Sequence, residues 1–210
     1  MQDVYFVNGL LDFIKKSPTP FHAVRSMSDI LDQAGFERLD ESEQWSMQDK
    51  TSGRYYVTRN DSSIIAFQLN QSLVENGMRM VGAHTDSPCL KVKPNPEIIN
   101  NNYLQLGVEV YGGVLLNPWF DRDLSLAGKV SYLNEEDVIE TQLIDLEKAV
   151  AIIPSLAIHL DRDANEQRTV NKQKHLPPVL MKLPENGIEK ESGNKSSVDN
   201  RVDFKTILLK

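Results

Sequence analysis

The sequence has almost no cysteine, no long apolar run and no excess of positive charge. Cys89 is the only cysteine, so no intrachain disulfide can form, which is consistent with a reducing, cytoplasmic location. The absence of 18 consecutive apolar residues argues against a membrane-spanning helix, and Met1–Asp3 does not begin a secretory signal. The formal net charge of -7 argues against nucleic acid as a partner, because phosphate binding requires a basic surface.

The chain has 210 residues, of which 40% are hydrophobic, and this is enough for one large domain or two small ones. It begins with two segments that have the pattern of amphipathic helices. Asp3 is expected to cap the N-terminus of a helix that ends before Pro18. Thr19 is expected to cap a second helix, which ends at Gly35. Apolar residues recur at helical spacing, at Val4, Val7, Leu10, Leu11 and Ile14 in the first helix and Val24, Met27, Leu31 and Ala34 in the second. This spacing predicts that both helices bury one face in a core.

Strand patterns follow the helices. Arg54–Thr58 and Ile64–Leu69 flank the turn-forming run Asn60–Ser63, which predicts a β-hairpin. Apolar residues in Met78–Ala83 then predict a short buried strand that ends at His84. Two helices, a hairpin and a central strand indicate one α/β unit over residues 1–92.

The composition changes after Pro94-Asn95-Pro96. Apolar residues at every second position between Leu104 and Val110 predict a half-buried strand, and residues 129–133, 138–144 and 150–153 are further strand candidates. Residues 161–174 are polar, and residues 185–200 are predicted to be a long loop or a disordered segment. Residues 93–210 therefore form a second, β-rich region.

One polar turn could carry chemistry. His84-Thr85-Asp86 follows the predicted buried strand, and ligands often bind where the strands of α/β sheets end. A neutral imidazole binds zinc, and a carboxylate two residues away could orient the ring or share the metal. Taken alone, this short motif is also compatible with an ordinary hydrogen-bonded turn.

Five segments, in this order and at these separations, carry a resemblance to a known family: Ser17–His22, Gly82–Pro88, Tyr111–Gly113, Trp119–Leu124 and Ile153–Leu160. Together they resemble the M18 metalloaminopeptidases, the aspartyl aminopeptidases and their bacterial relatives. Any single segment could arise by chance, whereas five collinear segments extend over nearly the whole chain. The resemblance corresponds to the N-terminal half of such an enzyme.

The resemblance implies a two-zinc hydrolase that removes N-terminal residues, acidic or neutral, from peptide substrates. It also implies a fold in which a zinc-exopeptidase-like α/β catalytic domain is interrupted by a β-rich oligomerisation domain. By this reading, residues 1–92 are part of the catalytic domain and residues 93–210 are an incomplete insertion. The family forms dimer-based homo-oligomers, often dodecamers.

The resemblance also assigns roles to single residues. His84 matches the first zinc ligand of the family, and Asp86 matches the carboxylate that orients it; the peptide after Asp86 is often cis in such enzymes. His159 matches a histidine of the β-rich domain that is thought to reach a neighbouring subunit's active site and help bind substrate. The residue pattern alone leaves open that His159 is a partly buried strand histidine.

Other motifs of the family have no match here. Family members run to about twice this length, and their second half carries the remaining metal ligands and the general base. Asp199-Asn200 only superficially resembles the bridging Asp-Asn pair of the family, so the sequence supplies part of an active site. Two alternatives remain: a catalytically inactive assembly or binding module, and a single-zinc site in which His22, His159 or Asp199 converges on His84.

Several other polar residues lie in or near these motifs. We interpret His22, at the start of the second helix, as structural, and the Asp121-Arg122-Asp123 run as an ion-paired turn or interface anchor. A preference for acidic side chains would require a lysine or arginine in the pocket, because an unpaired buried carboxylate is costly. Lys91 and Lys93 are close enough in sequence to His84 to be considered, although nothing in the sequence selects them.

Overall fold

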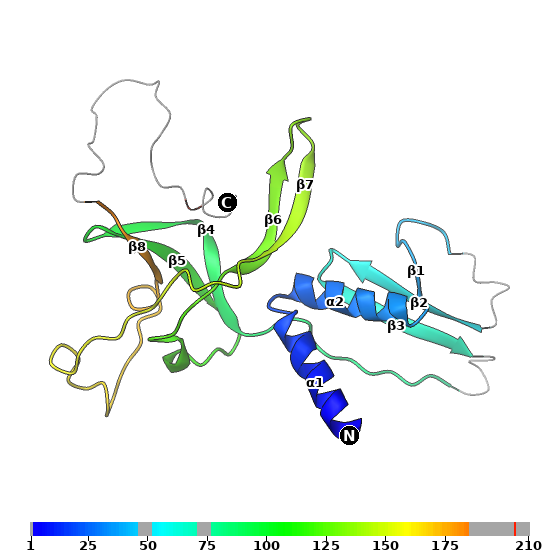
Figure 1. Cartoon of the computed structure of the whole chain (residues 1–210), viewed down its shortest axis with the longest axis horizontal. Coiled ribbons are helices and arrows are strands. Elements are labelled where there is room, and N and C mark those ends of the chain that lie inside the picture. Colours follow the sequence, from blue (N-terminus) through cyan, green and yellow to red (C-terminus); the bar gives the residue numbers. More distant parts are fainter. Residues whose placement is uncertain (1, 46–51, 71–76, 185–203, 205–210) are drawn as a thin grey trace. The chain divides into compact units, whose positions relative to one another are not determined.

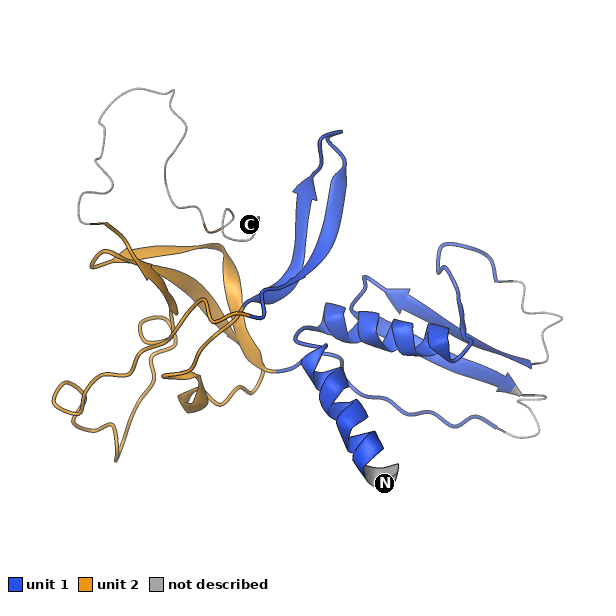
Figure 2. Ribbon diagram, in the orientation of Figure 1, with its two compact units in different colours: residues 1–87, 126–147 blue, residues 88–125, 148–210 orange. Residues whose placement is uncertain are grey.

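The computed structural model describes residues 2–45, 52–70, 77–184 and Phe204. It divides into two compact units, residues 1–87 with 126–147 and residues 88–125 with 148–210 (Figure 2). This division lies at residue 88, and it places the segment 126–147 in the first unit. The assignment of catalytic and oligomerisation domains to residues 1–92 and 93–210 stays a prediction.

Unit 1 begins with the two helices that the sequence predicts (Figure 1). Helix α1 spans Gln2–Lys15, so Asp3 lies inside the helix instead of capping it, and helix α2 spans Pro20–Gln33. The Thr19 side chain accepts a hydrogen bond from the backbone N–H of His22, and Gly35 follows the second helix with φ 77°. The capping threonine and the left-handed glycine therefore fix the two ends of α2.

The predicted burial of α1 is wrong. Most of its apolar residues are exposed, and only Phe13 is half-buried among those whose burial is described; the exposed residues are Val4, Tyr5, Phe6, Val7, Leu10, Leu11 and Ile14. In α2, by contrast, Ala23, Val24 and Ser28 are buried, although Ala34 at its end is exposed. Helical spacing makes one face apolar, but burial also requires a second layer, and the described part of unit 1 supplies no such layer over α1.

The helices accompany a three-stranded sheet of order β1-β2-β3, formed by β1 (Glu37–Arg38), β2 (Ser52–Arg59) and β3 (Ser63–Asn70). The predicted hairpin is confirmed, since β2 and β3 pair antiparallel. Asn60 and Asp61 occupy its turn with φ values of 52° and 54°, as a tight primed turn requires. Tyr56 of β2 is buried, and its hydroxyl donates a hydrogen bond to Asp32 of α2 over 2.7 Å.

A second hairpin completes unit 1, formed by β6 (Ala127–Leu133) and β7 (Ile139–Asp145), close to the predicted ranges. The Asn134 side chain accepts hydrogen bonds from the backbone N–H groups of Glu136 and Val138, which closes the turn. Lys129 of β6 lies 4.7 Å from the ring centre of Phe21 and 3.6 Å from the Asp61 carboxylate. This lysine joins the hairpin to α2 and to the β2–β3 turn.

Unit 2 is built on an antiparallel sheet of order β4-β5-β8, with β4 (Cys89–Asn100), β5 (Tyr103–Tyr111) and β8 (Val179–Lys182). Strand β5 confirms the predicted alternation. Pro94-Asn95-Pro96, read above as a break in composition, instead lies inside β4, where the register shifts between Val92 and Glu97. Prolines are tolerated at such a bulge because the ladder is interrupted there.

The core of unit 2 is formed by residues that are 4% exposed or less, namely Leu104, Leu106, Val108, Ile153 and Leu176. The candidate strand 150–153 makes only isolated bridges, in which Ala151 faces Leu124 and Ile152 faces Val179. A short 3-10 helix, η1 (Asn117–Trp119), precedes them. The polar residues 161–174 form a turn-rich loop. The stretch 185–200, predicted to be a long loop or a disordered segment, lies outside the described residues.

Helix length also bears on membranes. Among the helices that the structure describes, none is long and apolar enough to cross a bilayer.

Candidate metal site

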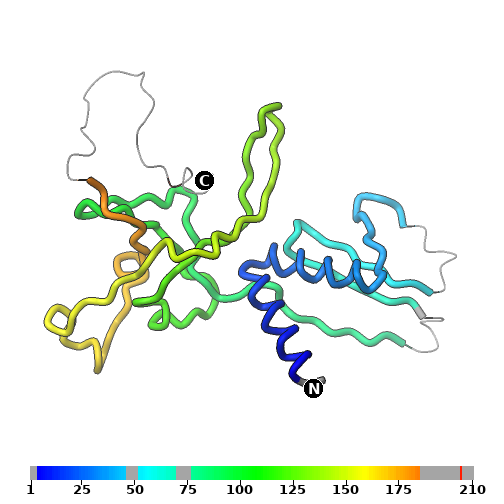
Figure 3. Tube along the Cα trace, in the orientation of Figure 1, coloured from blue at the N-terminus to red at the C-terminus, as the bar shows by residue number. Residues whose placement is uncertain are grey.

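The segment that carries the candidate ligand differs from its prediction. Residues 77–84 form no strand, and Met80 and Val81 are 84% and 100% exposed. The trace runs as irregular chain toward Ser87 (Figure 3). A strand exists only through hydrogen bonds to a neighbour, and the described residues provide none for this segment, so the predicted buried strand over Met78–Ala83 is wrong.

His84 and Asp86 lie together at the end of this segment. The Nδ1 atom of His84 is 2.8 Å from the backbone carbonyl oxygen of Asp86 and 3.3 Å from its carboxylate Oδ1. Because both oxygens are acceptors, Nδ1 carries the proton when the ring is neutral, and the Nε2 lone pair is left for another partner. The His84 side chain is 81% exposed, so Nε2 is accessible.

Thr85 anchors this turn, a role that the sequence analysis missed. Its hydroxyl donates a hydrogen bond to the backbone carbonyl of Ser62 over 2.8 Å. Ser62 lies in the β2–β3 turn, so the end of segment 77–84 is tied to the beginning of β3. The only sequence signal for this anchoring role was the position of Thr85 between His84 and Asp86. The sequence does not show which backbone carbonyl the threonine hydroxyl contacts.

The donor set near His84 is not sufficient for a complete zinc site. One imidazole nitrogen with a supporting carboxylate fits the first position of such a site. Structural and catalytic zinc sites require three or four protein ligands, and no cluster of three His, Cys, Asp or Glu side chains is found among the described residues. Within unit 1, His22 and His84 do not form such a cluster. Convergence of His159, which belongs to unit 2, on His84 stays a prediction, and Asp199 lies outside the described residues.

His159 belongs to unit 2, whereas His84 and Asp86 belong to unit 1. His159 is exposed in a turn over residues 158–160, so the reading as a partly buried strand histidine is wrong. Its role in substrate binding, like those of His84 and Asp86 in metal binding, stays a prediction. The described residues contain no cis peptide bond, so the cis peptide after Asp86 is not found.

Two of the motifs quoted above meet in unit 2. Asp121, with φ 55°, donates its backbone N–H to the carbonyl of Ile153, and its carboxylate accepts the backbone N–H of Ser155 over 2.8 Å. Hydrogen bonds from Ser155 lower the pKa of the Asp121 carboxyl below its usual range. Asp121 thus lies in a turn and fixes the beginning of the segment that leads to His159, but its carboxylate is held by a backbone N–H. The ion pairing and the interface role stay predictions.

His22 also has a structural place. Its Nδ1 atom lies 2.7 Å from the hydroxyl of the capping residue Thr19, at the beginning of α2. Burial lowers the pKa of His22 below its ordinary value of 6.5, and the nearby Asp145 carboxylate partly opposes this shift. A neutral, partly buried imidazole beside a helix cap confirms the structural interpretation of His22.

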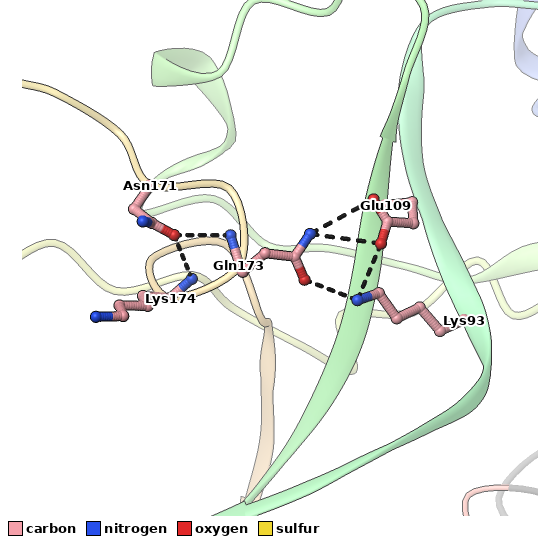
Figure 4. A network of polar contacts seen from close by, with 5 residues as sticks. All are labelled: Lys93, Glu109, Asn171, Gln173 and Lys174. Atoms are coloured by element: carbon pink, nitrogen blue, oxygen red, sulfur yellow. Dashed lines mark hydrogen bonds and ion pairs between the residues drawn. The ribbon is translucent and has the colours of Figure 1, made fainter.

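The two lysines proposed for an acidic-residue pocket have partners already, and Figure 4 shows those of Lys93. The Lys93 ammonium lies 2.9 Å from a carboxylate oxygen of Glu109 and donates to Gln173 over 2.7 Å. Lys91 lies 3.7 Å from the ring centre of Tyr111. Both ammonium groups already interact with side chains of unit 2, so the structure gives no reason to assign either lysine to a substrate carboxylate.

These observations describe a mixed α/β protein in which His84 and Asp86 form a candidate metal-ligand pair. Residues 13–209 match the family model described as aminopeptidase I zinc metalloprotease (M18). The chain belongs to the M18 aminopeptidase family.

Similar proteins agree with this membership. The chain is 56% identical over 201 residues to the probable M18 family aminopeptidase 2 of Pseudomonas putida KT2440, covering 95% of this chain and 43% of that protein. It is 59% identical over 176 residues to a protein of the same name from Pseudomonas aeruginosa LESB58, covering 83% of this chain and 40% of the relative. The chain thus spans less than half the length of these relatives.

Solved structures give the same result for the fold. A structure of the Ape4 and Nbr1 complex matches 89% of this chain and 36% of its own chain, with a TM-score of 0.75 and 38% identity. The crystal structure of an M18 family aminopeptidase from Thermotoga maritima matches 89% of this chain and 40% of its own, with a TM-score of 0.71 and 27% identity. The structure of the S. cerevisiae mApe1 dodecamer matches 73% of this chain and 36% of its own, with a TM-score of 0.66 and 32% identity. The mixed α/β fold is therefore that of part of an M18 aminopeptidase.

Proposed function

We propose that this chain is part of a cytoplasmic, zinc-dependent aminopeptidase that hydrolyses N-terminal acidic or neutral residues from peptides. Membership of the M18 family supports this reaction class. The single observation that carries the proposal is the His84–Asp86 pair, in which Nδ1 is held by Asp86 and Nε2 is accessible. A sequence with one cysteine, Cys89, can form no intrachain disulfide, which supports the cytoplasmic location.

Each residue of this pair has a distinct task in the proposal. Asp86 holds the proton on Nδ1 and so presents the Nε2 lone pair, which makes the imidazole a better ligand. When bound, two zinc ions would activate a water molecule and polarise the scissile carbonyl. The remaining ligands and the general base would come from the part of the family's polypeptide that this chain does not include.

In this proposal, His159 would act in the active site of a neighbouring subunit, which requires an oligomer. An exposed turn histidine that donates a hydrogen bond could orient the substrate or stabilise the developing oxyanion in a neighbouring subunit. We propose a dimer-based homo-oligomer for this reason, and the dodecameric yeast relative supports such an assembly. Nucleic acid is not expected as a partner at a net charge of -7.

The test uses a fusion of this chain to the portion of the Pseudomonas putida relative that the match does not cover. The fusion is expected to bind two zinc ions per subunit and to release N-terminal aspartate, glutamate or alanine from chromogenic substrates. His84→Ala should remove bound zinc and reduce hydrolysis at least a thousandfold, whereas Asp86→Asn should weaken zinc affinity by about 10- to 100-fold. His175→Ala, an exposed histidine of unit 2, is the matched control. Full hydrolysis by His84→Ala would contradict the proposal.

The second candidate is a catalytically inactive assembly or binding module. The observation that favours it is the lack of any three-ligand cluster among the described residues. It predicts oligomers of this 210-residue chain that bind zinc no more tightly than an isolated histidine would. Zinc titration and peptide hydrolysis with the fusion described above separate the two candidates, since only the enzyme would bind two zinc ions per subunit and require His84 for its activity.

A further inference from the structure

The turn that carries His159 is exposed together with the apolar residues beside it. The imidazole of His159 makes no hydrogen bond or ion pair with another described residue. Leu156, Ile158 and Leu160 are 61%, 46% and 74% exposed. A histidine that acts on a molecule outside its own subunit has to be exposed, and its backbone has to be held before contact if binding is not to cost conformational entropy.

Asp121 holds the beginning of this turn, which we define as residues 155–161 and call the His159 turn. The Asp121 carboxylate accepts the backbone N–H of Ser155 over 2.8 Å, and its own backbone N–H donates to the carbonyl of Ile153 over 2.9 Å. Ile153 is 1% exposed and therefore anchors this contact in the core of unit 2. The φ of 55° at Asp121 suits aspartate or asparagine, whose short polar side chains tolerate the left-handed region.

Arg168 holds the other end of the His159 turn. Its Nε atom lies 3.8 Å from a carboxylate oxygen of Asp161, and both side chains are half-buried, at 23% and 31% exposed. The guanidinium of Arg168 also lies 4.0 Å from the ring centre of Phe120 and donates to the side chain of Asn117 over 3.3 Å. A guanidinium that stacks on a ring and is partly shielded from water holds its partner more firmly than an exposed charge does.

Both ends of the His159 turn are thus bound by one short segment, residues 117–121, with Arg168 as the link at the second end. Between these ends, the carbonyl of Ala157 accepts the backbone N–H groups of Leu160 and Asp161 over 2.8 and 3.2 Å. A loop that is held at both ends and in the middle has few backbone conformations. The side chain of His159 therefore starts from a nearly fixed Cα position.

We propose that Asp121 and Arg168 are positioning residues, which fix the His159 turn and so present the imidazole to a peptide substrate in the active site of a neighbouring subunit. Neither residue needs to touch that substrate. The fixed turn rests on contacts within unit 2 alone, whereas its effect on hydrolysis rests on the proposed function. Any effect of Asp121 or Arg168 on hydrolysis should therefore pass through His159.

The first experiment is amide hydrogen exchange in the 210-residue chain. Asp121→Gly removes the carboxylate but suits the positive φ, so it should raise the exchange rate of the Ser155 amide at least about tenfold. Asp121→Asn keeps an acceptor oxygen and tolerates the same φ, and it should leave this exchange slow. Arg168→Gln should raise the exchange rate of the Asp161 amide. The Leu106 amide of the buried strand β5 should be unchanged in all three variants, which shows that unit 2 remains folded.

The second experiment is hydrolysis by the fusion described above. Asp121→Gly and Arg168→Gln should each lower kcat/KM about tenfold and leave bound zinc unchanged, because a misplacement of about 1 Å in a group that contacts substrate is costly. In a His159→Ala background, the same two changes should lower kcat/KM further by less than about twofold. Arg162→Gln, which changes an exposed arginine directly after the turn, is the matched control and should leave kcat/KM unchanged.

Two results would overturn the proposal. Equal losses of kcat/KM with and without the His159 side chain would show that Asp121 and Arg168 only stabilise unit 2. Unchanged exchange at Ser155 and Asp161 would show that the two residues do not hold the turn.

Failure of the proposed function gives different results. If the fusion binds no zinc and hydrolyses no peptide although exchange in the 210-residue chain responds as expected, the proposed function is wrong and the fixed turn stands. Full hydrolysis by His159→Ala would overturn the role of His159 and, with it, the effect of the positioning residues on hydrolysis.

Discussion

Unit 2 buries the apolar residues of its central strand, whereas unit 1 exposes those of its first helix. The β4–β5–β8 sheet buries Leu104 and Leu106 almost completely, whereas α1 exposes Leu10 and Leu11. Periodicity is clear in both regions, with a period of two in the strand and helical spacing in the helix. The difference lies in the neighbours, since β5 is paired with β4 on one side and with β8 on the other, and the core of unit 2 also contains the buried Ile153 and Leu176. A pattern predicts which face will be buried, but a second layer decides whether it is.

The largest effect is expected for the core of unit 2. Leu106→Ala removes a side chain that is 1% exposed and leaves a cavity among its neighbours, so we expect the free energy of unfolding to fall by about 2–4 kcal/mol. Urea unfolding followed by circular dichroism measures this loss. A change close to zero would mean that unit 2 is not packed around β5 as described.

A buried hydrogen bond in unit 1 should have the next largest effect. Tyr56→Phe removes the hydroxyl that donates to Asp32, at a residue that is 1% exposed, and should cost about 1 kcal/mol of unfolding free energy. Tyr132→Phe removes an exposed hydroxyl that donates to Glu140 over 2.9 Å, and it should produce no measurable change. Equal losses in thermal unfolding would contradict the contrast between buried and exposed hydrogen bonds.

The pH dependence of unit 1 should follow His22. Burial lowers its pKa below 6.5, so the unfolded chain takes up a proton more readily than the folded chain. Stability is therefore complete above pH 6.5 and is lost as the pH falls through the lowered pKa. His22→Asn, which cannot titrate, should make the melting temperature decline less between pH 7.5 and pH 5.5. An identical decline in both proteins would contradict this role.

The smallest effect is expected on the α1 face. Leu10→Ala changes the same residue type as Leu106→Ala, but at a position that is 52% exposed, so the free energy of unfolding should change by less than about 0.5 kcal/mol. Urea unfolding under the same conditions allows direct comparison of the two variants. A loss as large as that of Leu106→Ala would show that α1 is covered in solution by another chain.

Local signals in the sequence predicted local structure well. Thr19 with Pro20 marked the beginning of α2, and the run Asn60–Ser63 marked the turn between β2 and β3. Such features depend on a few adjacent dihedral angles and hydrogen bonds, which neighbouring residues determine. Strand β4 was missed because Pro94 and Pro96 normally interrupt strands, and only pairing with β5 on both sides of the bulge shows that the strand continues.

For the candidate site, too, the local features could be predicted from the sequence and the contacts between distant residues could not. Sequence determined that a histidine and an aspartate two residues apart would follow an apolar segment, and five collinear motifs placed the chain among M18 aminopeptidases. Only the tertiary structure decided that Asp86 holds Nδ1 of His84 and that Thr85 ties this turn to Ser62. It also decided that Met78–Ala83 pairs with no strand among the residues that the structure describes. Contacts between residues distant in sequence depend on which surfaces meet, and a one-dimensional pattern does not contain that information.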